Sequence, residues 1–167
     1  MHSSYIHPAI RELRDQQVRF APREKKLEQV DRAERLLLEL EDSRTYSYEY
    51  VCYRVTTFRP EAYPDVRMCG EEASHDLRLF VEDVSDSADL PVEEVSERVL
   101  TVNDLSRRFQ VSTKTISRWR RQGLVSRRFV FAGRKRVGFL ESSVERFVQH
   151  NADRVRRGAK FSQLTVD

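Results

Sequence analysis

The sequence predicts a mainly α-helical protein in two parts, an acidic helical domain over residues 1–97 and a basic domain over residues 98–167. Three observations support this prediction. Apolar residues recur at helical spacing, the two parts carry opposite net charge, and one short stretch has the pattern of a β-hairpin. A chain of 167 residues, 39% of them hydrophobic, can bury one moderate core or two small ones.

The charge divides sharply between the two parts. Residues 1–97 contain 13 Lys or Arg and 22 Asp or Glu, a net charge of −9, whereas residues 98–167 contain 17 and 5, a net charge of +12. From Glu71 to Glu97, ten acidic residues accompany a single basic one, Arg78. The segment Asp89-Leu-Pro-Val92 has the composition of a linker, which predicts a domain boundary between Pro91 and Glu97.

Prolines mark the start of the first two predicted helices. Pro8 begins a short helix, and Pro22 is well placed for the first turn of a longer one that ends near Asp42. The expected inward residues are apolar: Ile10, Leu13 and Val18, then Leu27, Val30, Leu37 and Leu38. We interpret the longer helix as a core element, with a dimerising coiled coil as the alternative.

A tyrosine-rich segment follows, with tyrosines at positions 46, 48, 50 and 53. Val51, Val55 and Phe58 favour a helix ended by Pro60, although alternate tyrosines leave a strand as a second option. The acidic surroundings argue against a base-stacking surface, so these rings are expected in the core and at its rim. A further helix is predicted over residues 70–83, with three inward residues: Leu77, Phe80 and Val81.

The basic domain starts with a helix whose beginning is well marked. Thr101 and Asp104 have the Thr-x-x-acid spacing in which the hydroxyl accepts from first-turn amides and the carboxylate lies near the positive end of the helix. Val102, Leu105 and Phe109 then form one apolar stripe.

A second short helix follows after a tight turn at Gln110-Val111. Ser112 is the expected cap, Ile116 and Trp119 point back at the first helix, and Gly123 ends the element. The outward residues are the candidate readers of DNA bases: Thr113, Lys114, Ser117, Arg118 and Arg121.

A β-hairpin and a closing helix complete the domain. Two β-prone runs, 129–131 and 136–139, are joined by residues 132–135, a turn with cations at its tip. Ser142-Ser-Val-Glu145 has the form of a capping box, and an amphipathic helix then runs toward Gly158. Its apolar residues are Val144, Phe147, Val148 and Val155.

This frame carries eleven Lys or Arg residues and no Asp or Glu between Leu105 and Leu140. A helix fits the major groove, where Arg and Lys pair with guanine acceptors, and a basic hairpin tip can lie on the backbone or in a minor groove. The sequence therefore predicts DNA binding. The alternative is that the arginines serve solubility or a protein partner. Five residues of the hairpin region are assigned to backbone contacts: Arg127, Arg128, Arg134, Lys135 and Arg136.

The stretches Asp104–Leu124, Gly133–Val137 and Ser143–Phe147 resemble the winged helix-turn-helix of MerR-type regulators and phage excisionases. The resemblance spans roughly residues 99–150. It implies reader roles for the outward residues of the second helix and wing roles for residues 134–136. Gln110 departs from the family, which often has Gly at this turn. A left-handed backbone there costs a non-glycine residue roughly 1 kcal/mol, so the motif tolerates it.

The whole chain is similar to an amino-terminal extension found in one group of bacterial RNA polymerase sigma factors. The similarity rests on Tyr48–Val55 through Glu61, His75–Asp83, the winged motif and Phe161–Thr165. It implies that the chain is a fragment or a free-standing copy of such an extension, and the Ser-Gln-Leu-Thr ending favours a fragment. RNA polymerase is then an expected partner beside double-stranded DNA.

Other classes of function have little support. No run approaches the roughly 20 apolar residues of a transmembrane helix, and the residues near Met1 do not suggest a signal peptide, so we expect a cytoplasmic protein without a membrane partner. Cys52 and Cys69 lack metal-ligand spacing and are expected to be plain thiols. His75-Asp76 beside Glu72 imitates an acid/base site, but adjacent helical residues face different ways, which favours a surface histidine.

We therefore expect that the protein is not an enzyme and that it binds no cofactor or metal ion. The predicted function is a sequence-specific DNA-binding module acting in transcription initiation, as part of a sigma factor or associated with one. Two alternatives stay open. One is a protein-interaction adaptor whose acidic domain docks a basic partner, and the other is an excisionase- or MerR-like regulator unrelated to sigma factors. The oligomeric state is left open.

Overall fold

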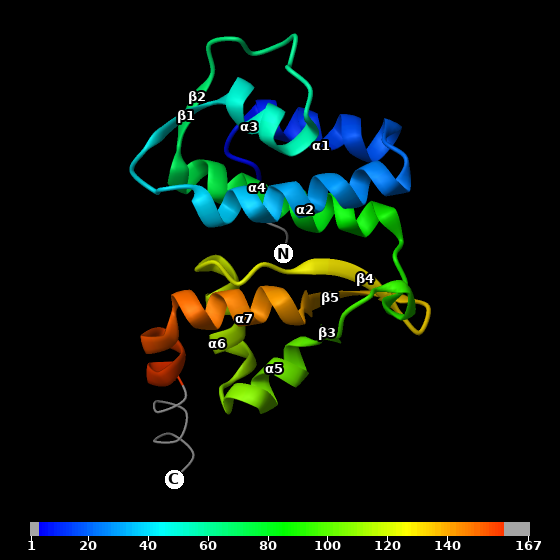
Figure 1. Cartoon of the computed structure of the whole chain (residues 1–167), viewed down its shortest axis with the longest axis vertical. Coiled ribbons are helices and arrows are strands. Elements are labelled where there is room, and N and C mark those ends of the chain that lie inside the picture. Colours follow the sequence, from blue (N-terminus) through cyan, green and yellow to red (C-terminus); the bar gives the residue numbers. More distant parts are fainter. Residues whose placement is uncertain (1–3, 159–167) are drawn as a thin grey trace. The chain divides into compact units, whose positions relative to one another are not determined.

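The computed structural model describes residues 4–158 and is mainly helical, as predicted, with two small antiparallel sheets (Figure 1). The chain divides into two units, Met1–Asp89 and Leu90–Asp167. The closing stretch Phe161–Thr165 that contributed to the sigma-factor resemblance lies outside the described residues. Between residues 4 and 158, no helix combines the length and the apolar character needed to cross a membrane.

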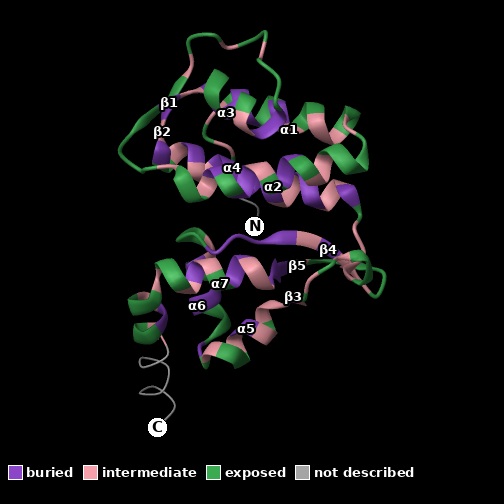
Figure 2. Cartoon of the chain, in the orientation of Figure 1, coloured by how far each residue is buried: buried purple, intermediate pink, exposed green. Residues whose placement is uncertain are grey.

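The first unit has four helices, and α4 lies against both α1 and α2. Its elements are α1 (Pro8–Phe20), α2 (Arg23–Glu39), β1 (Thr45–Ser47), α3 (Tyr48–Thr56), β2 (Arg67–Cys69) and α4 (Gly70–Ala88). Strands β1 and β2 pair antiparallel with Tyr46 opposite Met68. On α1, α2 and α3, buried residues line one side and exposed residues the other, which is the pattern that the helical spacing predicted, whereas in α4 only Glu71 is exposed (Figure 2).

Several sequence expectations for this unit are corrected. On α2 the fully buried leucine is Leu36, whereas Leu38 is 49% exposed, because the core stripe continues from Val30 and Ala33 rather than along the leucine run. Phe58 is 70% exposed, since Thr57 takes a left-handed conformation and ends α3. The tyrosine segment forms a strand and then a helix, and α4 extends to residue 88 rather than 83.

Gly70 marks the closest backbone approach of this unit. A Cβ at this position would lie 1.9 Å from the carbonyl oxygen of Glu41, so only glycine fits there. The Gly70 amide donates to the Arg44 carbonyl at 2.8 Å, and the Glu71 amide donates to the Asp42 carbonyl at 3.1 Å. These contacts hold the start of α4 against the segment after α2.

The second unit builds a small sheet and several helical elements around one apolar cluster. Its elements are the 3₁₀ turn η1 (Val92–Glu94), β3 (Val99–Leu100), α5 (Val102–Phe109), α6 (Thr113–Arg121), β4 (Arg127–Phe131), β5 (Arg134–Leu140) and α7 (Glu141–His150). The sheet is antiparallel in the order β3-β5-β4. Leu105, Ile116, Trp119 and Phe139 are central members of the cluster.

The boundary between the units falls after Asp89, within the predicted linker Asp89–Val92 and just ahead of the predicted boundary between Pro91 and Glu97. Pro91 bridges Val130 of β4, and the Val130 amide donates to the Leu90 carbonyl at 2.9 Å. Leu90 and Pro91 therefore lie along the edge of β4, and the chain from Leu90 onward belongs to the second unit. The sequence assigns Pro91 to a linker, because no predicted strand precedes or follows it closely. In the structure it covers the edge of β4, a strand that lies far along the chain.

The start of α7 also differs from the prediction. The helix begins at Glu141, directly after β5, and Leu140 is its N-cap without a side-chain hydrogen bond. Ser142 thus lies inside the first turn, where its amide and hydroxyl donate to the two oxygens of the Glu97 carboxylate at 2.8 and 3.1 Å. A distant carboxylate replaces the predicted capping box. The helix stops at His150, and residues 152–158 resume helical structure after Asn151.

Candidate nucleic-acid interface

Both ends of α5 are set by local structure. The Asp104 amide donates to the Thr101 hydroxyl at 3.0 Å and the Thr101 amide donates to the Asp104 carboxylate at 2.9 Å, which is the predicted capping box. The hydrogen bond from the Thr101 amide holds the pKa of Asp104 below its usual value. Gln110 ends α5 in the left-handed conformation, with φ 54° and ψ 48°.

Helix α6 has one buried face and one exposed face. The Ser112 hydroxyl accepts from the Thr115 amide at 3.2 Å, so the predicted cap is present. Ile116 is fully buried and Trp119 is 2% exposed, with its ring 5.7 Å from Phe109 and 5.6 Å from Phe147. All five candidate reader residues are exposed: Thr113, Lys114, Ser117, Arg118 and Arg121.

Strands β4 and β5 form the predicted wing, with a tighter turn than expected. The turn consists of Ala132 and Gly133, both at positive φ (47° and 82°), while Arg134 already pairs with Phe131 in the ladder. Such a two-residue turn follows the twist of the strands, at some strain to Ala132. Arg134, Lys135 and Arg136 thus lie on a strand, and all three are exposed.

The other two wing candidates differ from these. Arg127 is only 7% exposed, because alternation along β4 turns it inward together with Phe129. Arg128 is half-buried, and its guanidinium donates to the Lys135 carbonyl at 3.4 Å. The structure therefore removes Arg127 from the exposed set and places Arg128 at its margin.

Two cations of the basic stretch pair with acids that flank it in the sequence. Arg107 lies 2.7 Å from the Asp104 carboxylate, and Arg108 donates to both oxygens of Glu141 at 2.6 and 3.1 Å. The hydrogen bond from Arg108 lowers the pKa of Glu141. A third, Arg120, donates to the Ser126 hydroxyl at 3.2 Å. The exposed cations on α6 and the wing are Lys114, Arg118, Arg121, Arg134, Lys135 and Arg136.

Sequence reasoning missed this division among the cations. Asp104 and Glu141 lie immediately before and after the acid-free stretch Leu105–Leu140. Their carboxylates nevertheless pair with arginines inside that stretch. The Arg107–Asp104 pair has the i, i+3 helical spacing, so the sequence carried a signal for it. The Arg108–Glu141 pair joins α5 to α7 and had no such signal.

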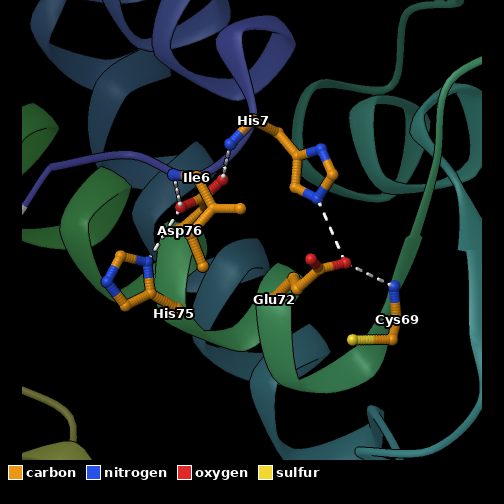
Figure 3. A network of polar contacts seen from close by, with 6 residues as sticks. All are labelled: Ile6, His7, Cys69, Glu72, His75 and Asp76. Carbon is orange, nitrogen blue, oxygen red and sulfur yellow. Dashed lines mark hydrogen bonds and ion pairs between the residues drawn. The ribbon is translucent and has the colours of Figure 1, made fainter.

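The histidine and carboxylate groups of the first unit form a polar network (Figure 3). The sequence predicts that His75 and Asp76 face apart. In the structure His75 Nδ1 lies 2.9 Å from Asp76 Oδ1, an oxygen that also accepts the Ile6 amide. Asp76 is fully buried and accepts the amides of Ile6 and His7 at 2.8 Å each. Its oxygens therefore hold the backbone before α1 against α4.

Glu72 has a similar role one turn earlier on α4. Its carboxylate accepts the Cys69 amide at 3.1 Å and lies 3.3 Å from His7 Nε2. The hydrogen bond from Cys69 lowers the pKa of Glu72. Both cysteines are free thiols, Cys52 buried and Cys69 half-buried. Within the described residues, no group of His, Cys, Asp and Glu side chains is arranged to hold a metal ion.

The second unit thus offers a ligand an exposed basic helix face and a basic hairpin, both on a packed frame. No protein-family model matches the chain, and no curated protein or solved structure matches it.

Proposed function

We propose that the second unit binds double-stranded DNA, with α6 contacting base edges in the major groove and the wing contacting the phosphate backbone of the DNA. The observation that carries the proposal is the two-sided character of α6. Because Ile116 and Trp119 are buried, the opposite face has a fixed orientation and presents Lys114, Arg118 and Arg121 together. Arg and Lys on a helix can donate to the acceptors of guanine, and Thr113 and Ser117 can contact bases or phosphates.

The ion pairs support a division of labour among the cations. Arg107 and Arg108 have carboxylate partners within the unit, so their first role is structural. Arg134, Lys135 and Arg136 are exposed on β5, where a cation can contact phosphates without reading sequence. In this proposal, specificity comes from α6 and a large share of the affinity comes from the wing.

The proposal extends to transcription initiation in the cytoplasm, with the module as part of a sigma factor or acting beside one and with RNA polymerase as a second partner. What supports this step is the similarity of the tyrosine-rich segment, the His75–Asp83 stretch and the winged motif to a sigma-factor extension. A pull-down of purified core RNA polymerase with the full chain tests it, and no retention of polymerase at low salt would contradict it.

The DNA-binding step is tested by selection from a pool of random duplexes with the full chain. The expected result is enrichment of one motif over successive rounds, together with loss of that enrichment in Arg118→Ala. Arg156→Gln, outside α6 and the wing, is the matched control and should select the same motif. Binding without enrichment would leave only a non-specific backbone role, and absence of binding would contradict the proposal.

A second candidate is a protein-interaction adaptor in which the first unit docks a basic partner. The observation that favours it is a set of exposed aromatic residues on that acidic unit, with Tyr50 40%, Tyr53 49% and Phe58 70% exposed. Large exposed aromatic residues are typical of interfaces. If this is the sole function, the full chain binds no duplex, and changes on α6 leave partner binding unaltered.

A further inference from the structure

Residues 152–158 form a short basic helix that packs directly on α6. The Val155 amide donates to the Asn151 carbonyl at 3.0 Å, and the Val155 side chain is buried in the apolar cluster of the second unit. A Cβ at Gly158 would lie 2.9 Å from Trp119 Cζ2 and 3.5 Å from Thr115 Cγ2. The backbone of this helix therefore contacts the same element that carries the candidate reader residues.

The contact line on α6 separates its core side from its cationic side. Thr115 and Trp119 form the line that touches the short helix. Ile116 lies on one side of this line, in the apolar cluster. Because a helix turns by about 100° per residue, Arg118 and then Lys114 follow on the other side. Both of these cations are exposed.

The short helix has the same arrangement. Gly158 touches α6, and Val155 lies on the side that enters the apolar cluster. By the same helical geometry, Arg154 and then Arg157 lie on the side away from that cluster. Since both helices direct one side of their contact into a common core, their cationic sides lie together on the outside. Arg154 and Arg157 thus continue the row formed by Lys114 and Arg118.

The third arginine of this helix differs from the other two. Arg156 lies on the opposite flank and is 2.6 Å from the Asp153 carboxylate. Arg157 is exposed, and Arg154 is half-buried, with its guanidinium 3.3 Å from the Asn151 side-chain oxygen. Arg156, which is ion-paired to Asp153, therefore serves as a matched control for Arg154 and Arg157.

We propose that residues 152–158 are a third DNA-contacting element, in which Arg154 and Arg157 bind phosphates beside the groove that α6 enters, on the flank of Lys114 and Arg118. This inference rests on the proposed function, because it places these phosphates on the duplex that α6 reads. The contact carries no sequence information, since phosphates are the same at every position.

The test compares Arg154→Gln/Arg157→Gln with Arg156→Gln in the full chain, by fluorescence anisotropy with a labelled random duplex. The double variant should bind three- to tenfold more weakly at about 0.1 M salt, and its slope of log K against log salt should be shallower by about 1 to 2. Arg156→Gln should stay within twofold of the wild type. The single variant Arg157→Gln, at an exposed position, gives a second reading if the double variant melts early.

The outcomes separate this inference from the function on which it rests. If the wild type binds and Arg118→Ala weakens binding, while Arg157→Gln and the double variant match Arg156→Gln, the third element is refuted and α6 remains the reader. If the wild type binds no duplex at any salt concentration, the proposed function fails and this inference fails with it. Equal weakening by Arg156→Gln and Arg157→Gln would also overturn it, because general charge would then explain the effect.

Discussion

The two units use their charged side chains in opposite ways. In the first, two carboxylates of α4 point inward: Asp76 accepts two backbone amides at 2.8 Å each, and Asp83 accepts from Tyr5 and Arg14 at 2.7 and 2.6 Å. Burial raises the pKa of Tyr5 well above its usual range. In the second, cations on α6 and the wing point outward. A stretch rich in one charge therefore indicates an interface only after the partners of each group are known.

The largest expected effect concerns the frame beneath the outward cations. Trp119→Ala removes the buried ring between Phe109 and Phe147 and should destabilise the second unit by about 3–5 kcal/mol. The substitution removes the only tryptophan, so its near-ultraviolet circular dichroism is lost whether or not the unit unfolds. Amide hydrogen exchange of α6 and the wing measures the destabilisation instead. Protection that survived the change would show that the exposed face does not depend on the buried one.

The next effect concerns the inward carboxylates. Asp76→Ala leaves the amides of Ile6 and His7 without an acceptor and should lower the free energy of unfolding of the first unit by about 3 kcal/mol. Asp76→Asn keeps an acceptor and should cost less. Urea unfolding measures both. DNA binding of either variant at a temperature where it stays folded should match the wild type, and a large change there would mean that Asp76 has a role beyond this unit.

Substitutions on α6 and on the wing should affect DNA binding differently, because the first set contacts bases and the second contacts phosphates. Arg118→Ala should weaken binding to the selected duplex by about 1–3 kcal/mol and reduce the preference over random sequence. Arg134→Ala, on the wing, should weaken binding to both duplexes about equally. Competition titrations with the two duplexes give these ratios, and identical behaviour of the two variants would contradict the division between α6 and the wing.

The smallest effect is a pH dependence at the start of α5. The pKa of Asp104 lies below its ordinary value of about 4, so its contribution to stability is present above that pH and is lost as the pH falls below it. Asp104→Asn should therefore cost about 1 kcal/mol at pH 7 and less at pH 3. Thermal melts at the two pH values check this, and an equal cost at both would assign the effect to shape rather than charge.

The helix-turn-helix frame was predictable because its determinants are local. The Thr101–Asp104 box, the Ser112 cap and the buried pair Ile116 and Trp119 depend on residues within a few positions of each other. The contacts missed were those between distant residues. Glu97 caps α7 from 45 residues away, and Arg108 pairs with Glu141 over 33. Strand β3 has only two residues, too few to show a period.

The measurement closest to the central claim is the salt dependence of duplex binding by the full chain. Exposed cations on α6 and the wing, with those of residues 152–158, can neutralise about 4 to 7 phosphates, which predicts a slope of log K against log salt of roughly −4 to −6. A titration of a labelled duplex from about 0.05 to 0.3 M salt gives this slope directly. A slope in that range supports DNA binding through the outward cations. A flat dependence, or no binding at the lowest salt, would contradict it.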